Sequence, residues 1–164
     1  LAHPVRAIER KDVPRAIAIA EELDATYWLW GPAEDGYGDE LSRILDRARC
    51  RVVHRAPDVD PIDLYRAANA VLFPSTWEGF GNPPVEAAMH DLPAAVGPYP
   101  VADELRRLGF HWFPTDDAGP LGRFLADPDP AILAHNRDVA RTHLSLESMT
   151  EALRALFDEA GWIP

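Results

Sequence analysis

The sequence of 164 residues has little of several features on which whole classes of protein depend. Cys50 is the only cysteine, so no disulfide can form within the chain, and a reducing, cytoplasmic setting is expected. No apolar run approaches the roughly 20 residues of a membrane-spanning helix, and no signal peptide is recognisable. Acidic residues outnumber basic ones by 27 to 16, and this net charge of −11 argues against a nucleic-acid polymer as partner.

Strand-like and helix-like segments alternate along most of the chain. Strands are predicted at 1–6, 26–30, 51–54, 70–74, 94–96 and 111–113, and helices are predicted to begin near 12, 39, 61, 83 and 101. Such alternation is typical of a doubly wound parallel sheet. The expected fold is therefore α/β, a Rossmann-like parallel sheet of about six strands with helices on both faces.

The pattern becomes helical only from Ala118 onward. We expect this C-terminal tail to pack back against the sheet through its apolar residues. These residues are Leu133, Leu144, Met149, Leu153, Leu156 and Phe157. The chain opens on Leu1 directly in a predicted strand, so we expect residues 1–164 to be one domain, its first strand clipped, from a longer protein.

Uncommon residues gather where the predicted strands end. The sets are Arg6, Arg10 and Lys11 after the first strand, Gly31, Gly36 and Gly38 after the second, His54, Arg55 and Pro57 after the third, and residues 75–82 after the fourth. In an open parallel sheet, ligands bind beyond the carboxyl ends of the strands. Loops collect glycine, proline and arginine for other reasons, which accounts for part of this pattern.

The stretch "FPSTWEGFGNPPVEAAMH", residues 73–90, predicts a strand, a glycine-rich loop and a helix. Gly79 and Gly81 let a backbone approach a ligand closely and offer unhindered amides. The helix is predicted to begin near Pro83 with Asn82 as its cap, because proline suits the first turn. A helix N-terminus attracts phosphate, so the amides from Gly79 to Asn82 are candidate phosphate ligands.

Two glutamates flank this loop. Glu86, placed in the first turn of the predicted helix, is suited to accept hydrogen bonds from ribose hydroxyls, although an acid there also balances the helix dipole. Glu78 lies in the loop and can accept hydrogen bonds from sugar hydroxyls, or it is simply a solvated acid. A hydrolytic pair of carboxylates is a further alternative, but it leaves the glycine loop, Arg6 and Lys11 without a role.

Positive charge gathers at one place in this acidic chain. Lys11 is the only lysine, and it follows Arg6 by five residues across the end of a strand and the start of a helix. An arginine fork and a compact ammonium group suit a diphosphate. The alternative is that Lys11 and Arg10 are ordinary solvated cations.

The stretch "FPSTWEGFGNPPVEAAMHDLP" resembles the donor-site signature of the glycosyltransferase group 1 (family 4) enzymes. Arg6 and Lys11 resemble that family's arginine and lysine in type and spacing, and "LWGPAEDGYGDEL" resembles the segment with its glycine after the second strand. The similarity covers about residues 1–115. It implies the carboxyl-terminal, donor-binding half of a GT-B enzyme, whose acceptor is bound mainly by an amino-terminal domain absent here.

The resemblance also implies a role for each matching residue. Arg6 and Lys11 would bind the donor diphosphate, Glu86 the ribose, and Glu78 the transferred sugar, so that Arg6, Lys11 and Glu78 are the candidate catalytic residues. The donor-binding set is Arg6, Lys11, Gly31, His54, Arg55, Glu78, Gly79, Phe80, Gly81, Asn82 and Glu86. His54 and Arg55 would lie along the nucleobase.

By the same resemblance, the enzyme transfers a sugar from a nucleoside-diphosphate sugar (UDP- or GDP-linked) with retention, uses no metal or other cofactor, and is inactive without its other domain. That missing domain would also be the part to make any peripheral membrane contact. Two alternatives stay open: a non-catalytic module that binds a nucleotide or sugar phosphate, and another GT-B enzyme such as a nucleotide-sugar epimerase. A phosphorylase is disfavoured because it needs a lysine for pyridoxal phosphate, and Lys11 is the only lysine.

Overall fold

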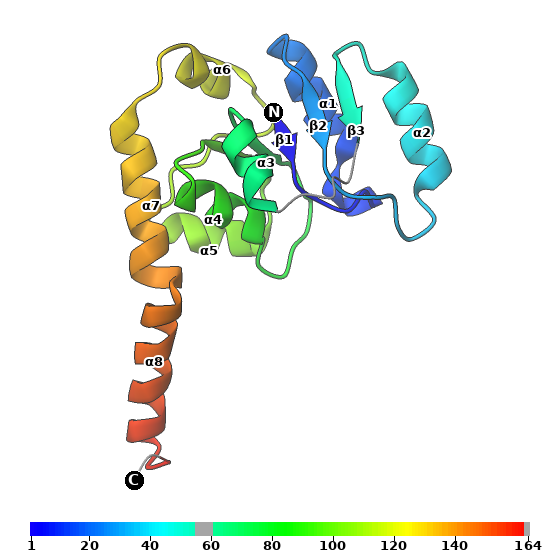
Figure 1. Ribbon diagram of the computed structural model, residues 1–164. Coiled ribbons are helices and arrows are strands. Elements are labelled where there is room, and N and C mark those ends of the chain that lie inside the picture. The colour runs from blue at the N-terminus through cyan, green and yellow to red at the C-terminus, as the bar shows by residue number, and fades with distance from the viewer. Residues whose placement is uncertain (55–60, 163–164) are drawn as a thin grey trace.

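The computed structural model describes residues 1–54 and 61–162 (Figure 1). The strands are β1 (Ala2–His3), β2 (Tyr27–Leu29), β3 (Val52–His54), β4 (Val71–Phe73) and β5 (Ala94–Val96). The helices are the 3-10 turn η1 (Glu9–Lys11), α1 (Val13–Glu22), α2 (Gly38–Arg47), α3 (Pro61–Ala67), α4 (Asn82–Met89), α5 (Pro100–Arg107), α6 (Gly119–Ala126), α7 (Pro130–Leu144) and α8 (Leu146–Glu159).

The strands form one parallel sheet in the order β3-β2-β1-β4-β5. Right-handed crossovers place α1 and α2 on one face and α3 and α4 on the other, and Figure 1 shows α3 and α4 on the opposite side from α2. The direction of strand addition reverses between β1 and β4. The predicted Rossmann-like, doubly wound fold is confirmed, and its topological switch point lies between these two strands.

The predicted strand count of about six is wrong by one, because residues 111–113 add only an isolated bridge between Ala95 and Phe113. The side chain of Asn136 explains why no strand forms there. Its Oδ1 accepts from the His111 amide at 2.8 Å, and its Nδ2 donates to the His111 carbonyl at 2.9 Å. The backbone at His111 is thus satisfied by a helix side chain instead of by a sheet ladder.

The first strand is shorter than the predicted 1–6, since only Ala2 and His3 pair with neighbours. Pro4 follows them and has no amide hydrogen for the ladder. By contrast, β4 is fully buried along its length, as its continuous run of apolar residues predicts. The start of α1 is also as predicted, because the Asp12 side chain accepts from the Arg15 amide at the N-cap.

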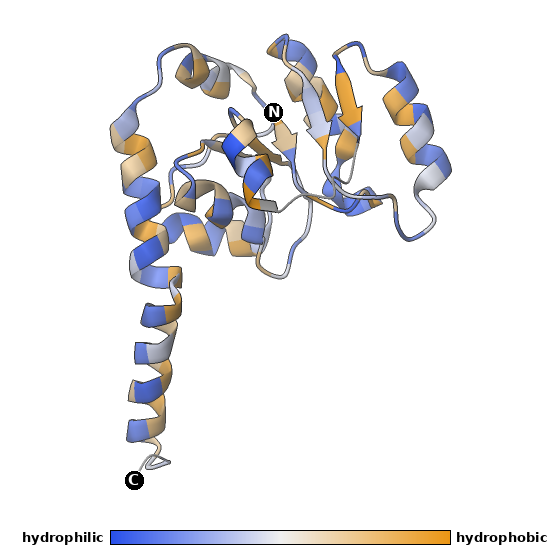
Figure 2. Cartoon of the chain, viewed as in Figure 1, coloured by the Kyte–Doolittle hydropathy of each residue, from blue (hydrophilic) through white to orange (hydrophobic). Residues whose placement is uncertain are grey.

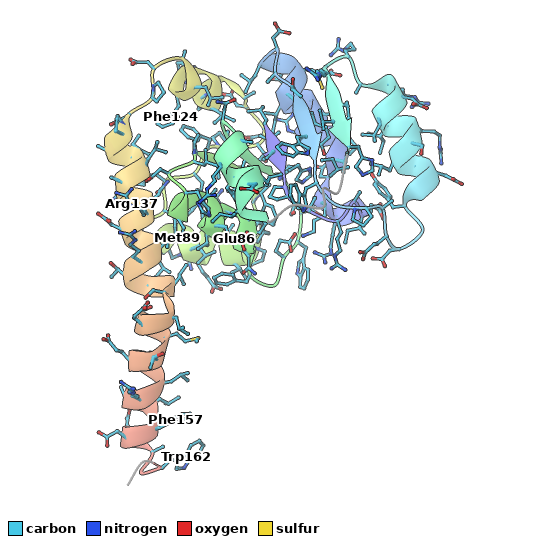
Figure 3. All side chains as sticks on the ribbon, viewed as in Figure 1. Glu86, Met89, Phe124, Arg137, Phe157 and Trp162 are labelled. Atoms are coloured by element: carbon cyan, nitrogen blue, oxygen red, sulfur yellow. The ribbon has the colours of Figure 1, made fainter. Side chains whose placement is uncertain are left out.

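The C-terminal helices behave differently from each other. The predicted packing against the sheet is wrong for α7, which packs on α4 through Val139 and Ala140. Arg137 Nη1 also lies 2.6 Å from an oxygen of Asp91, just after α4. The prediction is wrong for α8 as well, which has no buried residue and extends away from the body, with Phe157 and Trp162 at its far end (Figure 3). Ser145 separates the two helices, since its extended backbone ends α7 and its hydroxyl caps α8.

Candidate functional site

The candidate site lies at the switch point, where the loops after β1 and β4 meet. The amide of Thr76, after β4, donates to the carbonyl of Arg10, after β1, at 2.9 Å. This bond joins the two segments that the sequence singled out separately. The edge of the sheet predicted to bind a ligand therefore holds both the cationic turn and the glycine loop.

A buried cluster of charges lies where these two loops meet. Lys11 is 8% exposed and Glu78 is 9% exposed, and the Lys11 ammonium donates to Glu78 Oε1. Arg10 approaches the other carboxylate oxygen, with its Nη1 3.2 Å from Glu78 Oε2. Arg10 also lies over the Trp77 ring, 5.8 Å from its centroid. One carboxylate therefore bridges two cations from the neighbouring strand end.

Opposing effects act on the pKa of the Lys11 ammonium group. Burial lowers the pKa of Lys11, the bond to Glu78 and its charge oppose that effect, and the charges of Arg10 and Arg6 lower the pKa further. The Phe73 ring lies under the ammonium, with the centroid 5.1 Å from Nζ. A second anion at this point would relieve the cost of burying the cation.

The two glycines of the loop differ in how much space surrounds them. A side chain at Gly79 would meet nothing, whereas a Cβ at Gly81, where φ is +92°, would lie 2.2 Å from the Tyr99 hydroxyl oxygen. That buried hydroxyl has no hydrogen-bond partner among the described residues. Gly81 is thus the point where the chain turns closely over Tyr99 before α4 begins.

The start of α4 differs by one residue from the prediction. Gly81 is the N-cap, and Asn82 is the first helical residue and provides no side-chain cap. Glu86 consequently lies in the second turn, and the first turn holds no acidic residue. A simple balance of the helix dipole therefore no longer explains Glu86, because that effect is confined to the first turn.

The carboxylate of Glu86 is fixed by a residue from another helix. The hydroxyl of Tyr65, on α3, donates to Glu86 Oε2. The Tyr65 ring stacks on His90 at the end of α4, with 5.2 Å between the ring centroids and an interplanar angle of 13°. Burial, together with the bond to Glu86, raises the pKa of Tyr65.

The last residue of β3 contacts the loop after β2. His54 Nε2 and the Gly31 carbonyl oxygen lie 2.9 Å apart. A Cβ at Gly31 would lie 2.2 Å from the Val5 carbonyl oxygen, so this glycine allows two loops to pack together. Arg6 reaches across to Glu34, 2.7 Å away, and stays largely exposed. Arg55, predicted beside the nucleobase, lies outside the described residues.

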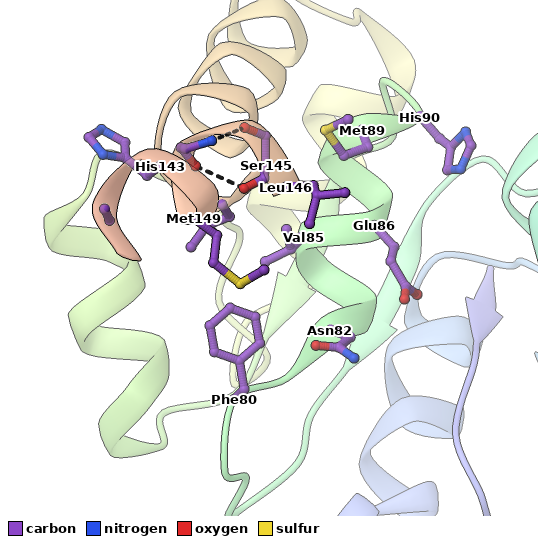
Figure 4. A pocket seen from close by; sticks show the side chains of 13 residues that line it. Phe80, Asn82, Val85, Glu86, Met89, His90, His143, Ser145, Leu146 and Met149 are labelled. Carbon is purple, nitrogen blue, oxygen red and sulfur yellow. Dashed lines mark hydrogen bonds between the residues drawn. The ribbon is translucent and has the colours of Figure 1, made fainter. Parts of the chain in front are cut away.

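A cavity of about 720 Å³ opens beside the site, between α4 and the junction of α7 and α8 (Figure 4). Its lining includes Phe80 and Glu86 from the predicted donor set, together with Met89, Leu146 and Met149. No cluster of three or more metal-ligating side chains occurs within residues 1–54 and 61–162. In that same part of the chain, every helix is too short or too polar to cross a membrane.

Sequence reasoning missed two features of this site. The donor-binding set inferred from the sequence lacks Arg10, whose guanidinium binds Glu78, and Tyr65, which binds Glu86. The only hint in the sequence is where these residues lie along the chain: Arg10 follows a predicted strand and Tyr65 precedes one. The contacts themselves join residues 68 and 21 positions apart, which spacing does not reveal.

Comparisons with known proteins bear on the family and on the fold. A family model for glycosyl transferases group 1 matches residues 9–118. The structure of HepE from Anabaena with UDP is similar, with a TM-score of 0.78 at 20% identity, covering 96% of this chain and 48% of HepE. Sucrose-phosphate synthase from Thermosynechococcus elongatus is similar with a TM-score of 0.75 at 21% identity, covering 96% of this chain and 45% of that one. A search of curated proteins found no match. The chain thus spans about half the length of these solved structures.

Proposed function

Because the chain belongs to the glycosyl transferases group 1 family, we propose that it is the donor-binding domain of a retaining, metal-independent glycosyltransferase. The observation that carries the proposal is the buried pair of Lys11 and Glu78 at the switch point, where Glu78 directly precedes Gly79 of the glycine loop. At this place a phosphate would meet a cation, the amides of the loop and a helix N-terminus.

The donor is a nucleoside-diphosphate sugar, and we take UDP as its carrier because HepE was solved with UDP and with UDP-glucose. In this proposal Lys11 and Arg6 bind the diphosphate, with the amides of Gly79, Phe80, Gly81 and Asn82. Glu86 accepts from the ribose hydroxyls and Glu78 from the transferred sugar. Gly31, His54 and Arg55 lie along the base.

Transfer breaks the bond between the sugar carbon and the diphosphate oxygen, so negative charge develops on the leaving group. In this proposal Lys11, Arg6 and the N-terminus of α4 supply positive charge there before the reaction starts, which would lower the barrier without reorganisation. This is the reason that no metal is required in the proposal. Chelation by EDTA should leave the affinity for UDP unchanged.

A second domain completes the enzyme in this proposal and binds most of the acceptor. The apolar side chains of α8 recur at intervals of three and four, and they are exposed: Leu146, Met149, Leu153 and Leu156. Figure 2 shows hydrophobic colour along one side of α8. Such a face needs a partner surface, and HepE has about as much chain again as the part matched here. We expect the 164-residue chain alone to transfer no sugar.

Calorimetric titration with UDP, GDP and ADP tests the donor site. We expect one of them, UDP first, to bind with a dissociation constant of roughly 1 μM to 1 mM, or about −8 to −4 kcal/mol. Glu86→Ala and Arg6→Ala should weaken binding, while the matched surface changes Glu104→Ala and Arg107→Ala should not. No binding at millimolar nucleotide, or equal affinity in all four variants, would show that the donor site has been assigned wrongly.

A further inference from the structure

Tyr65 has a place in the site that the donor contacts alone do not explain. It lies on α3, is 5% exposed, and donates its hydroxyl proton to Glu86 Oε2. Its ring stacks on His90, the C-cap of α4, four residues beyond Glu86. The three side chains are therefore linked in a row. The His90 ring stacks on the Tyr65 ring, and the Tyr65 hydroxyl bonds to the Glu86 carboxylate.

The direction of this hydrogen bond is fixed by chemistry. An ionised carboxylate only accepts, so the phenol must donate. Burial and the neighbouring carboxylate both raise the pKa of Tyr65, which keeps the phenol protonated at neutral pH. Tyr65 therefore donates at neutral pH to Glu86 Oε2, and it makes no hydrogen bond to Oε1.

Glu86 needs such a support because its surroundings do not confine it. The residue is exposed, and it lines the cavity beside α4. A free glutamate samples several rotamers, and a ligand must then bear the entropy of ordering it. Held by a buried ring, the carboxylate is already oriented when a ligand arrives.

We propose that Tyr65 is a positioning residue, which sets the Glu86 carboxylate to accept from both hydroxyls of the donor ribose. This inference rests on the proposed function, because it takes Glu86 as the ribose ligand. Tyr65 itself touches no substrate. Its contribution should appear in how strongly the chain prefers a nucleotide that carries the two ribose hydroxyls.

The test measures that preference directly. UDP and 2′,3′-dideoxy-UDP are titrated into the wild-type chain, Tyr65→Phe, Glu86→Ala and the double variant. Tyr65→Phe keeps the ring, and with it the packing on His90, but loses the hydroxyl. We expect it to weaken UDP binding by about threefold to tenfold, as for loss of one hydrogen bond, and to leave the dideoxy nucleotide nearly unaffected.

Matched variants separate positioning from general structure. Tyr27→Phe removes another buried tyrosine hydroxyl, which bonds to His3, and should leave the preference for UDP intact. In the Glu86→Ala background, Tyr65→Phe should have no further effect on the preference. His90→Ala removes the stacked ring and should lower the preference in the same direction, so the inference stays testable if Tyr65→Phe folds poorly.

The outcomes are distinguishable. If the wild-type chain does not bind UDP, or Glu86→Ala leaves the preference unchanged, the proposed function fails and this inference fails with it. If Glu86→Ala abolishes the preference while Tyr65→Phe and His90→Ala keep it at the wild-type ratio, the donor site stands and the positioning role of Tyr65 is overturned.

Discussion

Glu78→Gln removes the negative charge that bridges Lys11 and Arg10 but keeps the length of the side chain and an oxygen acceptor. Both members of the central pair are about nine-tenths buried, so their charges are poorly screened by water. The substitution leaves Lys11 as a buried ammonium group with no neutralising partner in contact. Folding and donor binding should respond in opposite directions.

The effect on stability can be bounded from the geometry. Loss of one member of a buried ion pair costs about 3–5 kcal/mol, and the glutamine oxygen retains a hydrogen bond from Lys11. We therefore expect the free energy of unfolding to fall by about 3 kcal/mol. The exposed pair of Arg6 and Glu34 is the matched control, since Glu34→Gln breaks a surface contact that contributes little.

The effect on UDP should have the opposite sign. If the diphosphate binds at Lys11 as proposed, Glu78 competes with it for the ammonium group and repels it. Unit charges about 4 Å apart interact by on the order of 4 kcal/mol at an effective dielectric constant of about 20, and reorganisation offsets part of this. We expect Glu78→Gln to bind UDP at least about tenfold more tightly. The gain in affinity from UDP to UDP-glucose should shrink, since Glu78 is the proposed sugar ligand.

Urea unfolding with and without UDP measures both effects in one experiment. At a UDP concentration of about 100 times the dissociation constant, the ligand adds about 2.7 kcal/mol to the stability, which would restore most of the loss in Glu78→Gln. The reasoning is refuted if Glu78→Gln is as stable as the wild-type chain, or if it binds UDP more weakly.

Three further changes test other parts of the structure. Gly81→Ala should destabilise the fold by at least about 1 kcal/mol and abolish UDP binding, because φ is positive and Tyr99 fills the space, whereas Gly79→Ala, in open space, should keep the stability in urea. Burial lowers the pKa of His3 to about 3, so the unfolded chain binds more protons than the folded chain between about pH 3 and 6.5. The free energy of unfolding should therefore fall as the pH falls through that window. The fall should be smaller in His3→Gln. Leu156→Glu on exposed α8 should change the unfolding free energy by less than about 0.5 kcal/mol; a larger loss in urea would mean that α8 packs against the body.

The sequence predicts the fold through its local patterns. The continuous apolar run of β4 and the cap at Asp12 both appear where expected, because each depends on neighbouring residues. Alternation of segments and the ends of strands predict that the loops after β1 and β4 meet at one edge of the sheet, and they do. What fails is the sixth strand, since the Asn136 side chain occupies the backbone of His111 from a helix 25 positions away.

The details of the site depend on contacts of the same long-range kind. Glu78 appears in sequence as a loop acid, and only the fold brings Lys11 and Arg10 against it. Tyr65 and Glu86 likewise lie on separate helices, α3 and α4, with β4 between them in the sequence, and only the fold brings their side chains together. The apolar stripe of α8 follows a pattern that predicts burial, but the pattern does not say which surface buries it.

The most direct measurement of the central claim uses the chain's own composition. Lys11 is the only lysine, so protein labelled with ¹³C at the lysine ε-carbon gives a single lysine resonance. We predict that UDP shifts this resonance with the dissociation constant found by calorimetry, that uridine does not, and that Glu78→Gln makes the response occur at lower UDP. UDP binding that leaves the Lys11 resonance unmoved would contradict a diphosphate site at the switch point between β1 and β4.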